Sequence, residues 1–208
     1  MLSINVLCVG KIKENYLKEA LLEYSKRVSK YCNLNIIEVQ DEKVPDKLSE
    51  KVIENIKGIE CEKICKYIKK DTCLIALDLK GKELSSEEFS KEIENISLNY
   101  SSITFVIGGT LGISNKILNQ CDKRICFSKM TFPHQLIRVF LLEQIFRGFK
   151  ISNGETYQHW SYEIKNSLEV PYSNGPIEGT NNKIKALKRT TYGMPNFTNF
   201  KARIMLLS

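Results

Sequence analysis

The sequence is short of histidine: its 208 residues include only His134 and His159. That scarcity argues against a zinc site, because Cys/His sites hold the metal through several ligands at characteristic spacings. Cys61 and Cys65 stand four residues apart on a helical pattern, but no further ligands obviously complete a site around them. We therefore expect a protein that binds no metal.

Long apolar runs are absent as well. No run approaches the ~18 residues that suggest a membrane-spanning helix. The first residues, MLSINVLCVGK, have no basic leader before a short apolar stretch, so we interpret them as a strand and not as a signal peptide. The seven cysteines are an odd number and fall mostly on apolar faces, which is typical of reduced, buried thiols. We expect a cytoplasmic protein with no membrane partner.

Charge and composition leave room for a nucleic-acid partner. The net charge is +7, of which residues 158–208 contribute +4 (seven Lys/Arg against three Asp/Glu) and residues 1–157 contribute +3 (24 against 21). Such a balance permits binding to RNA, because Lys and Arg neutralise phosphates. A hydrophobic share of 42% suffices for one domain with its own core plus an appendage.

Strand-like and helix-like segments alternate along the first three quarters of the chain. The strand-like segments are apolar without alternation, which is typical of a parallel sheet covered by helices on both faces. We therefore predict an α/β fold with a largely parallel sheet. The expected strands are 4–9, 34–39, 73–79, 103–107 and 124–127. The expected helices are 13–31, 49–70, 85–99, a short one from 114, and 133–150.

Two loops follow neighbouring predicted strands. The first is the glycine turn GGTLG at 108–112, and the second is the loop 128–132, after which Pro133 can open a helix. Ligands of open α/β sheets bind at the carboxyl ends of strands, where these loops lie. A glycine at Gly108 would let the backbone approach a ligand closely, although an ordinary tight turn explains the glycines equally well.

The motifs FVIGGTLG and FSKMTFPHQLIRVFLLEQIFRGF resemble the C-terminal half of the SPOUT-type methyltransferases that modify pseudouridine at N3 in large-subunit ribosomal RNA. The similarity extends from Met1 to about Tyr157, so the first domain is expected at 1–157. The resemblance implies a homodimer with a C-terminal trefoil knot. It also implies S-adenosylmethionine as the cofactor and the ribosome, through its 23S rRNA, as the partner.

The resemblance also assigns site residues. The cofactor pocket maps onto a strand end, the glycine turn and the loop that follows the last strand, namely Leu77, Gly108, Phe127, Ser128, Lys129, Met130, Thr131 and Phe132. The family's chain ends in Tyr-His and a basic residue close to the reacting centre. Tyr157 matches that ending, but Gln158 stands where the histidine belongs and His159 comes one place late. Tyr157, His159 and Arg138 are the candidate catalytic residues.

The predicted helix 133–150 is apolar on nearly every side, with Arg138 as the exception in its first half. Such a helix is buried on more than one side, either within one subunit or in a dimer interface, and the resemblance favours the dimer. His134 at its start is either a catalytic base or a capping residue. Glu143 and Arg147 are spaced to form a surface ion pair.

The composition changes after Tyr157. The segment SNGPIEGTNNKIKALKRTTYGMPNFTNFKARIMLL resembles the last part of a DDE-type insertion-sequence transposase, with its motif glutamate at Glu178. The two aspartates that such enzymes take from earlier segments have no counterpart here, and one glutamate cannot hold two metal ions. We therefore expect a transposase-derived tail at 158–208. An inactive fusion whose basic tail binds nucleic acid is the alternative function.

Overall fold

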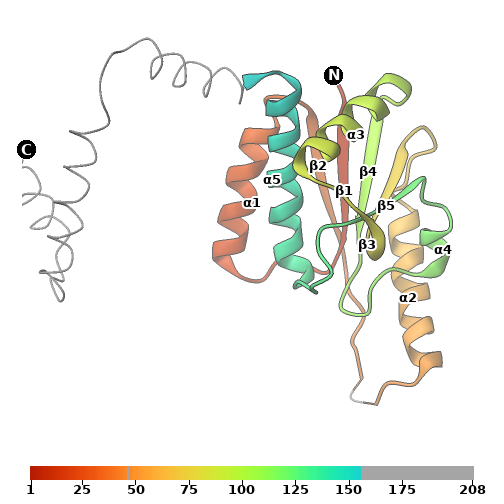
Figure 1. The fold of residues 1–208 in the computed structure, drawn as a ribbon. Coiled ribbons are helices and arrows are strands. Elements are labelled where there is room, and N and C mark those ends of the chain that lie inside the picture. The colour runs from red at the N-terminus through yellow and green to blue at the C-terminus, as the bar shows by residue number, and fades with distance from the viewer. Residues whose placement is uncertain (46, 156–208) are drawn as a thin grey trace, which may run out of the picture. The chain divides into compact units, whose positions relative to one another are not determined.

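The computed structural model describes residues 1–45 and 47–155. Every element predicted for this part of the chain is present, with shifts at the ends (Figure 1). The strands are β1 (Ser3–Val9), β2 (Asn33–Val39), β3 (Cys73–Glu83), β4 (Ser102–Ile107) and β5 (Lys123–Cys126). The helices are α1 (Asn15–Val28), α2 (Glu50–Cys65), α3 (Ser86–Asn99), α4 (Asn115–Leu118) and α5 (His134–Ser152).

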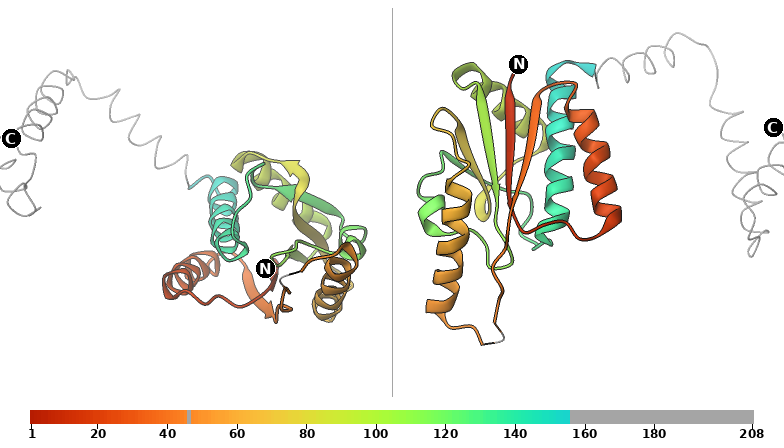
Figure 2. Two further views of the ribbon diagram at one scale, coloured as in Figure 1. Left: turned by 90° about the horizontal axis from the view of Figure 1, so that it is seen from below. Right: turned by 180° about the vertical axis from the view of Figure 1, so that it is seen from behind.

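The five strands form one sheet in the order β2-β1-β4-β3-β5, and every neighbouring pair is parallel. Helices α1, α3 and α5 pack on one face, and α2 and α4 pack on the other (Figures 1 and 2). The prediction of an α/β fold with a largely parallel sheet is therefore confirmed. The expected transposase-derived tail at 158–208 lies outside the described residues.

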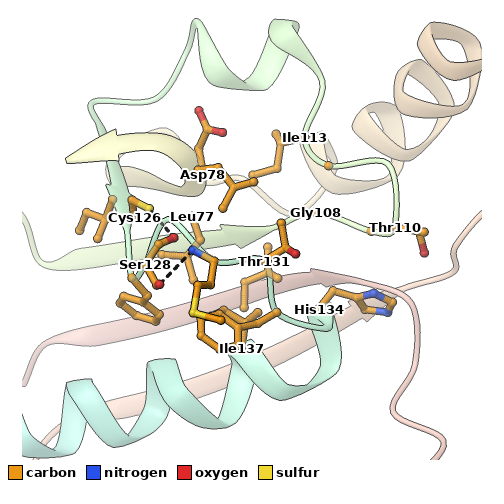
Figure 3. A pocket seen from close by; sticks show the side chains of 18 of the residues that line it. Leu77, Asp78, Gly108, Thr110, Ile113, Cys126, Ser128, Thr131, His134 and Ile137 are labelled. Atoms are coloured by element: carbon orange, nitrogen blue, oxygen red, sulfur yellow. Dashed lines mark hydrogen bonds between the residues drawn. The ribbon is translucent and has the colours of Figure 1, made fainter. Parts of the chain in front are cut away.

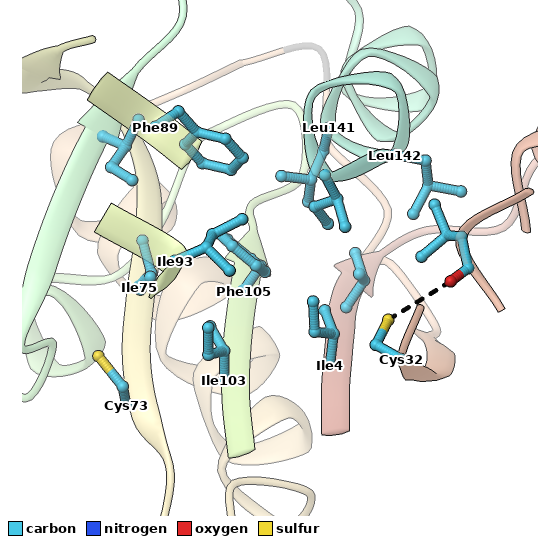
Figure 4. Packing of buried hydrophobic residues seen from close by; sticks show 14 of the residues in the cluster. Ile4, Cys32, Cys73, Ile75, Phe89, Ile93, Ile103, Phe105, Leu141 and Leu142 are labelled. Atoms are coloured by element: carbon cyan, nitrogen blue, oxygen red, sulfur yellow. Dashed lines mark hydrogen bonds between the residues drawn. The ribbon is translucent and has the colours of Figure 1, made fainter. Parts of the chain in front are cut away.

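The core explains why the strands lack an alternating pattern. Along β1, Ile4, Val6 and Cys8 belong to the cluster under α1, α3 and α5, whereas Leu7 and Val9 belong to the cluster under α2 and α4. Figure 4 shows the first cluster, in which residues from the central strands pack against α3 and α5. A strand with apolar neighbours on both faces has no position left for an exposed polar side chain.

Two predicted boundaries were wrong by four or more residues. Helix α2 ends at Cys65 and not at Lys70, because Ile64 is the last buried residue of its apolar stripe. Strand β3 continues past Leu79 to Glu83, since after an irregularity it pairs with β5 again at Ile125 and Cys126. Long-range pairing, which local sequence does not encode, decides the second boundary.

Helix starts follow their sequence signals closely. The Ser85 hydroxyl accepts a hydrogen bond from the Glu88 amide at 3.1 Å, and the Glu88 carboxylate accepts one from the Ser85 amide at 2.8 Å. These two hydrogen bonds form a capping box at the start of α3. Pro133 occupies the cap position of α5 with an extended backbone, so the helix begins at His134 and not at the proline.

Candidate functional site

A cavity of about 350 Å³ lies at the carboxyl ends of β4 and β5, against the middle of β3 and beside the start of α5 (Figure 3). It is formed where the two loops predicted to bind a ligand meet. Its walls are made by residues 77–79 within β3, 107–113 around the glycine turn, 125–128 and 130–132 around the last loop, and His134 and Ile137 of α5.

The glycine turn packs tightly against itself. A Cβ atom on Gly108 would lie 2.6 Å from the carbonyl carbon of Gly112, and Gly112 has a positive φ of 85°. The Gly112 amide donates a hydrogen bond to the Gly109 carbonyl at 3.1 Å. Gly108 is therefore required by the turn itself, which agrees with the ordinary explanation for a glycine there, and the turn then forms a wall of the cavity.

The loop after β5 is held by its own short contacts. The Cys126 thiol donates to the Ser128 carbonyl at 3.0 Å, and the Ser128 hydroxyl accepts a hydrogen bond from the Met130 amide at 3.0 Å. The segment and Leu77, in the middle of β3, line the same cavity (Figure 3).

The structure brings most of the predicted cofactor residues together. Seven of the eight line the cavity: Leu77, Gly108, Phe127, Ser128, Met130, Thr131 and Phe132. Lys129 is exposed and does not line it. Their role in holding a cofactor stays a prediction.

Arg138 lies elsewhere. Its side chain is fully buried, and its guanidinium donates to the Glu38 carboxylate at 2.6 Å and to the carbonyls of Val9 and Gly10 at 2.8 and 2.9 Å. These contacts join α5 to the ends of β1 and β2. Arg138 does not line the cavity, so its position gives the predicted catalytic role no support. Tyr157 and His159 lie outside the described residues.

His134 does reach the cavity wall, at the first position of α5. Burial, reinforced by the nearby positive charge of Arg138, lowers the pKa of the imidazole below its ordinary value. Its Nε2 atom faces Gly10 and Asp41, because a Cβ on Gly10 would lie 3.2 Å from Nε2 and 3.7 Å from the Asp41 Cγ. The imidazole is therefore neutral at pH 7 and can accept a proton.

Asp78 is a cavity residue that sequence reasoning missed. It follows Leu77 in β3, and its Oδ2 atom is buried with no hydrogen-bond partner in the described part of the chain. The available signal was a single carboxylate within the otherwise apolar strand segment LIALDL. Figure 3 shows Asp78 and His134 well apart, on the β3 and α5 sides of the cavity.

Residues 1–45 and 47–155 contain neither a metal-ligating cluster nor a membrane-spanning helix. No group of three or more His, Cys, Asp or Glu side chains there is arranged to hold a metal ion. The Cys61 and Cys65 sulfurs lie 3.8 Å apart, and burial raises the pKa of the Cys61 thiol. No helix of that region has the length and apolar character to cross a membrane.

Comparison with known proteins decides the family. The family model described as "Predicted SPOUT methyltransferase" matches residues 2–159. The chain belongs to the SPOUT methyltransferase family. Methyltransferase activity follows from that membership, and the cavity is the candidate site for it. The family model described as "Transposase" matches residues 148–204, so both resemblances found in the sequence are confirmed.

Curated relatives match the first part of this SPOUT chain over nearly their whole length. Proteins named "Ribosomal RNA large subunit methyltransferase H" from Clostridium kluyveri and Clostridium tetani are 57% and 56% identical over 157 residues, which is 75% of this chain and 99% of each relative. A solved structure of a probable methylase family protein from Haemophilus influenzae Rd KW20 covers 99% of this chain and 98% of its own. Its sequence identity is 13% and its TM-score 0.43, a likeness too low to bear on the fold.

Proposed function

We propose that this chain transfers a methyl group from S-adenosylmethionine to N3 of a pseudouridine in 23S ribosomal RNA. The observation that carries the proposal is the cavity where the glycine turn and the FSKMTF loop meet, in a SPOUT chain whose relatives are named as methyltransferases of large-subunit ribosomal RNA. The ribosome is then the partner from which the substrate comes.

The cavity fits the proposed cofactor. S-adenosylmethionine has an adenine ring and an aliphatic chain, which need apolar walls, and polar groups that need backbone donors and acceptors. Leu77, Phe127 and Ile137 supply apolar wall, and the backbone of the two loops supplies the hydrogen-bonding groups. The bound cofactor would bring an activated methyl group, so the chemistry calls for no metal.

The substrate nitrogen carries a proton at neutral pH and must lose it before it can attack the methyl group. Positioning the nitrogen in line, at about 3–3.5 Å from the methyl carbon, is the other requirement. His134 is a neutral imidazole at the cavity wall and is therefore one candidate to accept the proton. Tyr157 and His159 remain candidates from the segment that follows α5.

The proposed active form is a homodimer that packs through α5, and the trefoil knot is part of the same proposal. Support for the dimer comes from an exposed apolar patch beside the cavity, made of Met130, Phe132 and Phe140. The rings of Phe132 and Phe140 pack edge to face with their centroids 5.5 Å apart. An apolar patch of this kind marks an interaction site.

Residues 158–208 form a segment separate from the proposed methyltransferase domain. We assign 1–157 to the methyltransferase domain and 158–208 to a transposase-derived segment, since the relatives are covered to 99% by a match of 157 residues. An inactive fusion whose basic tail binds nucleic acid is the second candidate, favoured by the transposase match at 148–204.

The test uses purified chain, S-adenosylmethionine and ribosomes from cells that lack the methyl group. Mass spectrometry of the 23S rRNA before and after incubation should reveal one added methyl group on one pseudouridine. Methylation at a different base or in another RNA would contradict the proposal. Cofactor binding without any methylation, together with tight binding to unrelated DNA, would favour the inactive fusion.

A further inference from the structure

Asp78 carries an uncompensated negative charge at the cavity. The Oδ2 atom of its carboxylate is buried, and no described residue donates a hydrogen bond to it. Leaving a carboxylate oxygen buried and unpaired costs free energy, because the charged form loses its hydration and gains nothing in return. An unpaired, buried carboxylate oxygen in a cavity wall is therefore a candidate group for binding a ligand.

The rest of the cavity provides no positive charge. No lysine or arginine is among the described residues that line it, and Asp78 is the one acidic residue among them. Arg124 on the neighbouring strand β5 directs its guanidinium to the Leu118 carbonyl, at 2.9 and 3.2 Å. Arg138 is paired with Glu38, and His134 on α5 is neutral. Asp78 is therefore the one described cavity-lining side chain with a formal negative charge, and a second carboxylate, Glu60, lies behind the wall at Gly109.

We infer that Asp78 selects the positively charged methyl donor over its neutral product. The inference rests on the proposed function, because it takes S-adenosylmethionine to be the ligand. The donor has a sulfonium, whereas S-adenosylhomocysteine, which remains after the methyl leaves, has an uncharged thioether sulfur. The two ligands are otherwise alike, so a carboxylate that attracts the sulfonium favours donor over product.

Binding measurements can distinguish two roles of the Asp78 carboxylate. If Asp78 instead bound a ribose hydroxyl or the ammonium group, its removal would weaken donor and product equally, because both ligands have these groups. If it acts on the sulfonium, its removal weakens only the donor. The ratio of the two dissociation constants therefore reports the role, independently of any RNA methylation.

The experiment is isothermal titration of the full chain with each ligand, for the parent and for three variants. Asp78→Asn removes the charge, and Asp78→Glu retains it. Asp71→Asn is the matched control, since Asp71 is an exposed carboxylate before the opposite end of β3. For two charges several ångströms apart in a protein site, Asp78→Asn should shift the donor-to-product ratio on the order of tenfold toward the product. Asp78→Glu should shift it less, and Asp71→Asn should leave it unchanged.

Thermal unfolding of the same variants is the second measurement. Because Asp78 has no partner that Asn would leave unpaired, Asp78→Asn should unfold at a temperature equal to or above that of the parent. An unchanged ratio, or equal weakening of both ligands, would overturn the inference. A variant that fails to fold would also overturn it, since the protein itself would then need the charge. If the parent bound neither ligand, the proposed function would fail first, and the inference with it.

Discussion

Arg138 is the largest side chain that is fully buried in the described part of the molecule, and its charge is matched by Glu38 and two backbone carbonyls. Its neighbours on α5 pack into the main core, so the guanidinium lies at the junction of α5 with the ends of β1 and β2. A buried cation that donates to three acceptors holds these elements together. Its removal should therefore lower the free energy of unfolding.

Replacing Arg138 with methionine should lower the free energy of unfolding by about 3 kcal/mol, because Glu38 and two carbonyls lose their donors. Urea denaturation measures this. Arg147→Met is the matched control, since the Arg147–Glu143 pair is exposed on Arg147's side and should contribute less than about 1 kcal/mol. A stable Arg138→Met that binds cofactor but transfers no methyl would instead restore a catalytic role.

The His134 imidazole should titrate below its usual pKa, since burial and the Arg138 charge both oppose protonation. The folded pKa is depressed, so the unfolded chain binds the proton more readily. Stability is therefore full above the unfolded pKa of about 6.5 and falls as the pH drops from there through the folded pKa. NMR titration should place the midpoint below 6.5, and His134→Asn identifies the resonance.

The same pH dependence can be checked by thermal unfolding. The parent should lose more stability than His134→Asn between pH 7.5 and pH 5. Only in the parent does the unfolded chain bind a proton at this position more tightly than the folded chain does. Equal losses in the two proteins would mean that the imidazole is free to protonate in the folded state.

At the scale of elements, α5 has two different sides. Val139, Leu141, Leu142 and Ile145 are buried within the subunit, whereas Phe140 is 38% exposed beside Phe132. Burial within one subunit therefore accounts for part of the apolar character that the sequence displays, and the proposed dimer accounts for the rest.

Phe140→Asp should abolish the proposed dimer and leave the fold of the subunit intact. A charge in an apolar interface loses its hydration, whereas the same charge on a half-exposed site of a monomer does not. Sedimentation velocity at micromolar concentration measures the change. Leu98→Asp is the control, because Leu98 is apolar and 79% exposed on α3, away from the patch. A parent chain that already sediments as a monomer would refute the dimer.

The elements themselves could be predicted because their signals are local. Continuous apolar runs indicate buried strands, and Ser85 with Glu88 marks the start of α3. The strand order and the second pairing of β3 with β5 depend on contacts between distant segments, so local patterns do not contain them. Asp78 and the contacts of Arg138 were missed for a related reason, since whether a charge in an apolar segment is buried depends on what folds around it.

At the scale of the whole molecule, the end of α5 is fixed. The Tyr31 hydroxyl contacts both oxygens of the Glu155 carboxylate, at 2.9 and 2.8 Å, and its ring stacks on Phe149 with the centroids 5.6 Å apart. Tyr157, the first residue of the ending that the resemblance places near the reacting centre, follows the anchored Glu155 by two positions in the sequence. The relatives are matched to 99% of their length by 157 residues, whereas this chain continues to residue 208.

We predict that the full chain binds S-adenosylmethionine as well as a shortened chain does, but methylates ribosomes much more slowly. The proposed cofactor residues precede α5 in the sequence, whereas Gln158 and the residues after it stand where the resemblance places an ending near the reacting centre. Each 1.4 kcal/mol of lost positioning energy slows the reaction roughly tenfold, so a modest displacement suffices.

The matched protein is cut after Tyr157 and given a His-Lys ending. Calorimetry should give equal cofactor affinities, and methyl incorporation into ribosomes lacking the modification should be at least tenfold faster for the shortened chain. Equal methylation rates would establish that residues 158–208 and the altered junction leave the catalytic ending in place.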